Sequence, residues 1–412
     1  MDKNFIFFTL NDFLLTDGGT IRMNGIVGSL SDMGNKVTLI SNTSCTKDND
    51  SSNINHIHLA INNSKSYRRK YLFLLSILPF FIFRLIYRKD LNRIIRTFEE
   101  NNIEGCEVIF FEYIDNAIGY SLIKSGVKIN GVFDVHGVAD LEFLYKESAN
   151  IKSFIVNRVK FFLTKILDFK VFSKASKVIA LNEVFKQYLI DKYSYLDSSM
   201  FYIVDDGLTK ELREQEVNIK LRESLIDSLS ITPQTTVVFF AGYFKSLGGV
   251  PDLVEAFHAL MPFEDDAILV LVGDGEDYPY VSNYIQTHGL ESRIHLMGRC
   301  DYSNLKTYQS IGDVLVCPDR KHPYSDLIVH TKYYEALYTG KVVINGAFDS
   351  VLHINHDEAL SLLFEPSNIS DLSKQILFAI KNINELNMRY SGNKTSIPTI
   401  FSYSNAVLGF FK

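Results

Sequence analysis

The chain has 412 residues, of which 46% are hydrophobic and 22% are charged, as in an ordinary globular protein. This length is too great for one hydrophobic core, so we expect two domains of roughly 200 residues each. Residues 1–200 carry 25 Lys and Arg against 21 Asp and Glu, whereas residues 201–412 carry 17 against 27. The acidic second half, which shows no recognisable nucleic-acid-binding motif, argues against a nucleic-acid partner. The basic first half indicates contact with an anionic surface.

The cysteines and the N-terminus indicate the cellular setting. The four cysteines lie far apart and form no CxxC pair, which argues against structural zinc and a disulfide framework and fits a reducing cytosol. The first residues, MDKNFIFFTLND, contain too short an apolar run for a signal peptide. We expect this run to form the first strand of a sheet.

The opening of the chain has the pattern of a Rossmann-like unit. Phe5–Thr9 is predicted to be a buried strand, a loop with Gly18 and Gly19 leads into a helix, and KVTLIS forms the next strand. The unit lacks GxGxxG, so a dinucleotide is not implied. The alternative role of the two glycines is a tight turn that needs flexible backbone. Arg22, in the helix, is expected to be solvated.

Residues 65–98 surround an apolar stretch with nine basic residues and one acid. The apolar core, Tyr71–Phe83, falls short of the ~20 residues that a spanning helix needs, and Pro79 interrupts it. This composition favours a helix or hairpin that lies in the plane of a membrane. Residues 152–177 repeat the pattern, with seven Lys and Arg and one Asp. The alternative is that both segments are core helices whose Lys and Arg line the rim.

Two later strands are predicted, and each is followed by polar residues at its end. Val132–Asp134 reads as a strand that ends in the sequence Asp-Val-His-Gly, which contains His136. Open α/β sheets bind ligands at this carboxyl edge. Strand Thr236–Ala241, followed by Gly242, a loop with Lys245 and a helix, indicates a second Rossmann-like unit.

The stretch DVLVCPDRKHPYSDLIVHTKYYEALYTGKVVIN reads as a strand, a polar loop, a helix and a second strand. The helix is expected to open near His330 and Thr331, with Lys332 in its first turn and Glu335 one turn further. Backbone N–H groups at a helix start favour an anion, Lys adds formal charge, and a carboxylate can hold a sugar diol. This set suits a nucleotide diphosphate. The alternative is an ordinary unit in which Lys332 and Glu335 are solvated.

Within that stretch, HTKYYEALYTGKVVI resembles the nucleotide-sugar segment of retaining glycosyltransferases of family 4, whose usual form is close to PTKLLEYLASGKPVV. LSDMGNKVTLIS and the run from AILVLVGDGED to DVLVCP also resemble that family. The resemblance implies an α/β protein with two Rossmann-like domains that face each other across a cleft (GT-B), and a C-terminal helix that crosses back to the N-terminal domain. We expect an acceptor-binding domain at 1–190, a nucleotide-sugar domain at 200–385 and a returning tail at 386–412.

The resemblance also implies roles for individual residues. In the family, the Glu that matches Glu335 bonds the ribose hydroxyls, residues at Thr331 and Lys332 lie near the phosphates, and a His that matches His136 faces the transferred sugar. The expected catalytic residues are His136, Lys245, Lys332 and Glu335. The expected donor-binding residues are Gly18, Gly19, Gly242, Gly273, Gly298, Arg299, Asp326, His330 and Thr331. The alternative role of the glycines is to form turns, and the alternative for Arg299 is a solvated side chain.

The sequence departs from the family pattern at three positions. Tyr243 and Gly248 stand where the family has an Arg and a Lys that grip the diphosphate, and Leu327 stands where it has a first Glu. Lys245 and Asp326 are expected to substitute for the missing groups, and Asp319 is a weaker candidate.

The function implied by the resemblance is retaining transfer of a sugar from a nucleotide diphosphate sugar. It implies no metal and no cofactor, and the acceptor is expected to be a membrane-associated glycan or lipid-linked molecule in capsule or O-antigen assembly. We expect a cytoplasmic protein at the inner face of the plasma membrane, in peripheral contact with anionic lipid. A covalent route would need a carboxylate nucleophile such as Asp134. The alternatives are a nucleotide-sugar epimerase of the same fold and a catalytically weak partner subunit.

Overall fold

The computed structural model describes residues 4–11, 18–43, 53–135, 137–145 and 150–411. The chain forms two compact units: Met1–Asp205 together with Tyr403–Lys412, and Asp206–Ser402. Each unit is built on a parallel sheet flanked by helices, which confirms the expected pair of Rossmann-like domains. The units divide at 205/206 and 402/403, later than the boundaries near 190–200 and 386 expected from the sequence.

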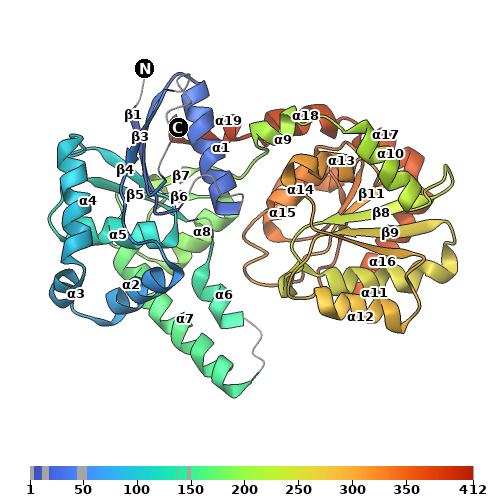
Figure 1. Ribbon diagram of the computed structural model, residues 1–412, viewed down its shortest axis with the longest axis horizontal. Coiled ribbons are helices and arrows are strands. Elements are labelled where there is room, and N and C mark those ends of the chain that lie inside the picture. The colour runs from blue at the N-terminus through green and yellow to red at the C-terminus, as the bar shows by residue number, and fades with distance from the viewer. Residues whose placement is uncertain (1–3, 12–17, 44–52, 136, 146–149, 412) are drawn as a thin grey trace. The chain divides into compact units, whose positions relative to one another are not determined.

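The first unit contains a seven-stranded sheet in the order β3-β2-β1-β4-β5-β6-β7 (Figure 1). Apart from residues 54–58 and 201–203 at its two edges, its strands are short, mainly apolar runs that bury both faces, as parallel sheets require. The strands are β1 (Asn4–Phe8), β2 (Lys36–Ser41), β3 (Ile54–His58), β4 (Glu107–Phe110), β5 (Asn130–Val135), β6 (Lys177–Ala180) and β7 (Phe201–Ile203). The helices are α1 (Gly18–Asp32), α2 (Lys65–Ile77), α3 (Phe80–Ile86), α4 (Arg88–Glu100), α5 (Tyr113–Lys124), α6 (Ala139–Tyr145), α7 (Ile151–Phe172), α8 (Glu183–Lys192) and α19 (Tyr403–Ala406).

Residues 65–98 form three helices rather than one helix or a hairpin. α2 ends before Leu78, and Pro79 occupies the N-cap of α3, because proline cannot continue a helix but fits its start. None of the described helices combines the length and the apolarity that crossing a membrane requires.

The last residues of the chain complete the first unit. The Tyr403 ring lies over Gly25 of α1, where a Cβ atom would come within 2.2 Å of it. The ring of Phe410 lies 5.6 Å from that of Phe5 and 5.5 Å from that of Tyr202. The C-terminal segment therefore returns to the first unit, as predicted, but only from Tyr403 onward. The helices α17 (Ile383–Tyr390) and α18 (Asn393–Ile400) remain in the second unit.

The second unit contains a six-stranded sheet in the order β10-β9-β8-β11-β12-β13. The strands are β8 (Thr236–Ala241), β9 (Ala267–Val272), β10 (Ile294–Gly298), β11 (Val314–Cys317), β12 (Val342–Gly346) and β13 (Leu362–Phe364). The helices are α9 (Lys210–Glu214), α10 (Ile219–Ser228), α11 (Val250–Leu260), α12 (Tyr278–Thr287), α13 (Leu305–Gln309), α14 (Thr331–Leu337), α15 (Asp349–Ile354), α16 (Ile369–Lys381), α17 (Ile383–Tyr390) and α18 (Asn393–Ile400).

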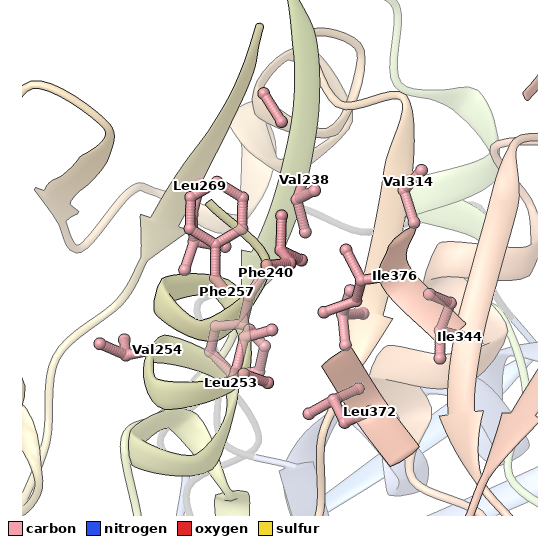
Figure 2. Close-up of a cluster of buried hydrophobic side chains, with 14 of the residues drawn as sticks. Val238, Phe240, Leu253, Val254, Phe257, Leu269, Val314, Ile344, Leu372 and Ile376 are labelled. Carbon is pink, nitrogen blue, oxygen red and sulfur yellow. The ribbon is translucent and has the colours of Figure 1, made fainter. Parts of the chain in front are cut away.

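Two apolar cores cover the faces of this second sheet. Figure 2 shows one of them, in which α11 and α16 pack their buried Leu, Ile and Phe side chains on β8, β9, β11 and β12. The other core contains α14, through Tyr333, Tyr334 and Leu337. The helices that follow the neighbouring strands β8 and β11 therefore lie on opposite faces. This is a topological switch point, where open α/β sheets bind ligands beyond the carboxyl ends of the strands.

Candidate functional site

A cluster of charged side chains lies at the switch point of the second unit, beyond the carboxyl end of β11. Its centre is Asp319, whose side chain is 2% exposed. Lys332 Nζ donates to Asp319 Oδ1 at 2.9 Å and lies 2.7 Å from Oδ2, and His330 Nε2 lies 3.8 Å from Oδ1. Thr331 is the first residue of α14, so the predicted start of this helix is correct. The buried Tyr333, Tyr334 and Leu337 fix α14 on the sheet and thereby fix Lys332.

The charge states within the cluster follow from its burial. Burial raises the pKa of Asp319, but Lys332, His330 and Lys245 together lower it below the ordinary value. Burial, with the charges of Lys245 and Lys332, lowers the pKa of His330 to about 3 despite the nearby carboxylate. His330 is therefore a neutral imidazole at neutral pH. Two lysines and one carboxylate remain charged, which leaves the cluster with a net positive charge.

Lys245, from the loop after β8, acts on this cluster through its charge on both Asp319 and His330. Its loop is held against the loop after β11 by close backbone packing at Gly249. That residue has φ +65°, and a Cβ atom on it would lie 1.8 Å from the Pro318 carbonyl oxygen. The charge of Lys245 thus acts on the same carboxylate as Lys332, although 87 positions separate the two lysines in the sequence.

Glu335 lies one turn further along α14. Its Oε1 accepts a hydrogen bond from the Tyr302 hydroxyl at 2.9 Å. Burial raises the pKa of Glu335, while the Tyr302 bond and the charge of Lys332 act in the opposite direction. The Tyr302 hydroxyl orients the carboxylate. The alternative of two solvated side chains is wrong, because Lys332 is 18% exposed and ion-paired and Glu335 is hydrogen-bonded.

Three of the predicted glycines meet at the ends of adjacent strands β8, β9 and β10. The Gly242 N–H donates to the Val272 carbonyl at 2.9 Å, and the Gly273 N–H donates to the Gly298 carbonyl at 2.7 Å. Gly273 has φ +141°, and a Cβ atom on it would lie 1.9 Å from the Gly242 carbonyl oxygen. Close backbone packing therefore requires glycine here, whatever ligand these residues bind.

The other predicted donor-binding residues of this unit lie in less constrained positions. Arg299 is 77% exposed, with its Nε 3.8 Å from Asp274 Oδ1. Burial and the charge of Asp349 raise the pKa of Asp326, which Lys321 partly offsets. Leu327, at the position where the resemblance implies a Glu, is a buried apolar residue.

A second ion pair in this region was not predicted. Arg320 Nε donates to Asp252 Oδ2 at 2.9 Å, its Nη2 donates to Oδ1 at 2.5 Å, and its Nη1 donates to the Ser246 carbonyl at 3.2 Å. This bidentate pair joins the loop after β11 to the first turn of α11 and to the Lys245 loop. The signal in the sequence was the dipeptide Asp319-Arg320 directly after a buried strand.

In the first unit, Gly18 and Gly19 open α1, and His136 lies outside the described residues. The expectation that Arg22 is solvated is wrong. Arg22 is 2% exposed, and its Nε and Nη2 donate to the two carboxylate oxygens of Asp134 at 3.2 Å each. Its Nη2 also donates to the Val204 carbonyl at 2.7 Å. Because Asp134 is buried and both its oxygens are bonded, it is unsuited to act as a nucleophile.

Metal-ligating side chains do not gather anywhere in the part of the chain that the structure describes: it holds no group of three or more His, Cys, Asp or Glu suited to a metal ion. A metal-independent reaction stays a prediction.

Residues 222–396 match the family model described as "Glycosyl transferases group 1". Sucrose-phosphate synthase from Thermosynechococcus elongatus is similar in structure, with a TM-score of 0.71 at 15% identity over 99% of this chain and 97% of that one. Anabaena Alr3699/HepE in complex with UDP-glucose gives a TM-score of 0.67 at 15% identity, over 98% of this chain and 97% of that one. WaaG, a glycosyltransferase involved in lipopolysaccharide biosynthesis, gives a TM-score of 0.62 at 14% identity, over 98% of this chain and 97% of that one. No curated protein matches the chain. These likenesses establish the two-domain GT-B fold.

Proposed function

We propose that this GT-B-fold chain is a glycosyltransferase that transfers a sugar, with retention of anomeric configuration, from a nucleotide diphosphate sugar to a glycan or lipid-linked acceptor. The matched family model covers the unit that carries Lys332 and Glu335. HepE, which has been solved with UDP-glucose, and WaaG support a sugar nucleotide as donor and a surface glycan as product. We place the enzyme in the cytoplasm, in capsule or O-antigen assembly.

The observation that carries this proposal is the cationic cluster of Lys245 and Lys332 around Asp319. Breaking the bond between the sugar and the diphosphate leaves negative charge on the leaving phosphate. Preorganised donors that face this charge lower the barrier. An ammonium group has three N–H donors, so the contacts of Lys332 with Asp319 leave at least one for a phosphate oxygen. Asp319 holds Lys332 in place before the donor arrives.

Glu335 completes the donor site as the acceptor for the ribose hydroxyls. A carboxylate can accept two hydrogen bonds from a diol, and the Tyr302 hydroxyl holds this one in a fixed orientation. The acceptor hydroxyl then attacks the sugar from the face that the diphosphate leaves, and its proton passes to the leaving phosphate. This route needs no carboxylate nucleophile, which agrees with the buried and paired state of Asp134.

Donor hydrolysis and nucleotide binding test the proposal. A panel of sugar nucleotides, incubated without acceptor, is expected to show slow hydrolysis of one member, and EDTA should leave the rate unchanged. An epimerase would instead interconvert two sugar nucleotides, and a non-catalytic subunit would leave all of them intact.

The site itself is tested by calorimetry with UDP and GDP. We expect Lys332→Ala and Glu335→Ala each to weaken binding about a hundredfold or more, because each removes a charged hydrogen-bonding partner. Lys374→Ala, at an exposed lysine of α16, is the matched control. Unchanged affinity in both site variants would refute this location of the donor.

A further inference from the structure

Three helices of the first unit expose large apolar side chains that a soluble surface normally avoids. α2, α3 and α7 hold more than half of the exposed large apolar residues among those the structure describes. The most exposed, between 50% and 80%, are Phe81, Leu85, Ile86, Ile151, Phe154, Ile155, Phe162 and Phe169. A patch of this kind marks an interaction site.

These side chains are not needed to pack the helices on the protein. The inner sides of α2 and α3, together with Tyr87 directly after α3, carry a separate aromatic cluster, in which the rings of Tyr71, Phe83 and Tyr87 lie 4.6 to 4.9 Å apart. On α7, the buried residues Leu167, Val171 and Phe172 pack its C-terminal half on the unit. The inner sides of these helices are therefore part of the core, which was the alternative interpretation of their sequence. That interpretation does not explain the apolar residues on their outer sides.

The three helices form one continuous face. α2 packs on both α3 and α7, and Figure 1 shows the three helices along one side of the first unit. Lys170 of α7 joins them directly, because its Nζ donates to the Leu75 carbonyl at 2.9 Å and to the Ser76 carbonyl at 3.0 Å. We call the outer surface of α2, α3 and α7 the basic apolar face.

The charge of this face has one sign. Its exposed basic residues include Arg69, Lys70, Arg84, Lys152, Arg158 and Lys160. The acid in these helices is Asp168, which is buried and accepts a hydrogen bond from Tyr193. The described part of the face therefore presents cations and apolar groups to solvent and no carboxylate. A protein partner of this chemistry would have to be both strongly acidic and apolar, whereas an anionic bilayer combines phosphate groups with hydrocarbon.

We propose that the basic apolar face docks on an anionic lipid bilayer. Phe81 and Leu85 of α3 and the apolar residues of α7 enter the boundary between headgroups and acyl chains. The Lys and Arg side chains extend from the same helices to the lipid phosphates. The face lies on the unit that does not carry Lys332 and Glu335, so the docking is independent of donor chemistry.

Co-sedimentation of the full chain with vesicles tests the docking. Vesicles of phosphatidylcholine with phosphatidylglycerol should bind the protein, pure phosphatidylcholine should bind it weakly, and high salt should weaken binding to the anionic vesicles. A variant with Phe81→Ser, Leu85→Ser, Phe154→Ser and Phe162→Ser should lower the partition coefficient about tenfold or more. A second variant, Arg158→Glu with Lys160→Glu, should lower it on anionic vesicles and leave the weak binding to neutral vesicles unchanged.

The matched controls come from the second unit. Phe263→Ser with Phe378→Ser, and Lys220→Glu with Lys374→Glu, change exposed residues of the same types and should leave binding unchanged. Thermal melts should show that all variants are folded, since the changed residues are exposed. Absence of wild-type binding to anionic vesicles, or an equal loss in the controls, would overturn the proposal. So would a wild-type dimer that the serine variant dissociates while vesicle binding persists, since the face would then belong to a second copy. None of these outcomes depends on a donor or an acceptor, so each leaves the transferase proposal intact.

Discussion

The carboxyl edges of the two sheets use charged residues in different ways. In the first unit, Asp115 lies at the switch point between β1 and β4, where its carboxylate accepts the N–H groups of Leu10 and Glu112 at 2.9 and 3.0 Å. Further along the same edge, Arg22 and Asp134 pair with side chains 2% and 0% exposed. In the second unit, Lys332 is 18% and His330 23% exposed around a buried Asp319.

The comparison shows how one architecture serves two purposes. In the first unit, these charged side chains pair with each other or accept hydrogen bonds from the backbone, and they thereby hold loops and strands together. Where the second unit leaves Lys332 partly accessible, an N–H group of this side chain stays available to the phosphate of the proposed donor. Accessibility, rather than the presence of charge, separates the proposed donor site from the buried Arg22–Asp134 pair in this protein.

The largest expected effect contrasts the two ion pairs. Arg22→Met should lower the free energy of unfolding by about 3–5 kcal/mol, because it removes the guanidinium that pairs with both oxygens of the buried Asp134 carboxylate. Lys332→Met should cost only about 1–2 kcal/mol, because the charge of Lys245 still acts on Asp319 and Lys332 is partly accessible to water. Urea unfolding of both variants measures the difference. A greater loss in Lys332→Met would contradict the structural role assigned to the Arg22 pair.

The second effect concerns the glycines of the two units. Gly273→Ala should destabilise the protein by about 2–4 kcal/mol, because its Cβ would collide with the Gly242 carbonyl at a positive φ. Gly28→Ala is the matched control in α1, where no atom lies within 4 Å of the added Cβ. It should stabilise the protein by about 0.5–1 kcal/mol, since alanine favours a helix. Equal effects of the two changes in thermal melts would argue against close packing at the strand ends.

The smallest effect is a pH dependence of stability that arises in the first unit. Burial raises the pKa of Asp168 to about 7, and Asp140 adds to this while Lys192 opposes it. The unfolded carboxyl has its ordinary value of 3.8, so this group makes the protein less stable as the pH rises from about 4 to about 7. Asp168→Asn should reduce the difference in unfolding free energy between pH 5 and pH 8 by about 1–3 kcal/mol. An unchanged difference, measured by urea unfolding at both pH values, would show that Asp168 is ionised throughout.

Much of the fold was predictable from local patterns. The strand predicted at Thr236–Ala241 coincides with β8, and the helix predicted after the Lys245 loop is α11. Such elements combine an apolar run or an apolar stripe with glycine or proline at their ends. The three helices of residues 65–98 were less clear, because their apolar residues are divided between the aromatic cluster and the exposed face.

The site was predictable only where its residues are neighbours in sequence. Thr331, Lys332 and Glu335 follow from one helix start, and the structure places the first two at the switch point. Tyr302 contacts Glu335 from 33 positions away, Arg320 contacts Asp252 from 68 and Arg22 contacts Asp134 from 112. These pairs form because the strand order brings distant loops together, and no local spacing encodes them.

The contact of Tyr403 with Gly25 has a consequence for synthesis at the ribosome. Residues 403–412 leave the ribosome after the whole of the second unit, yet they supply the rings of Tyr403 and Phe410 to the first. The first unit, although translated first, therefore stays incompletely folded while the second unit is synthesised. The nascent chain cannot complete its earliest half until its latest codons have been read.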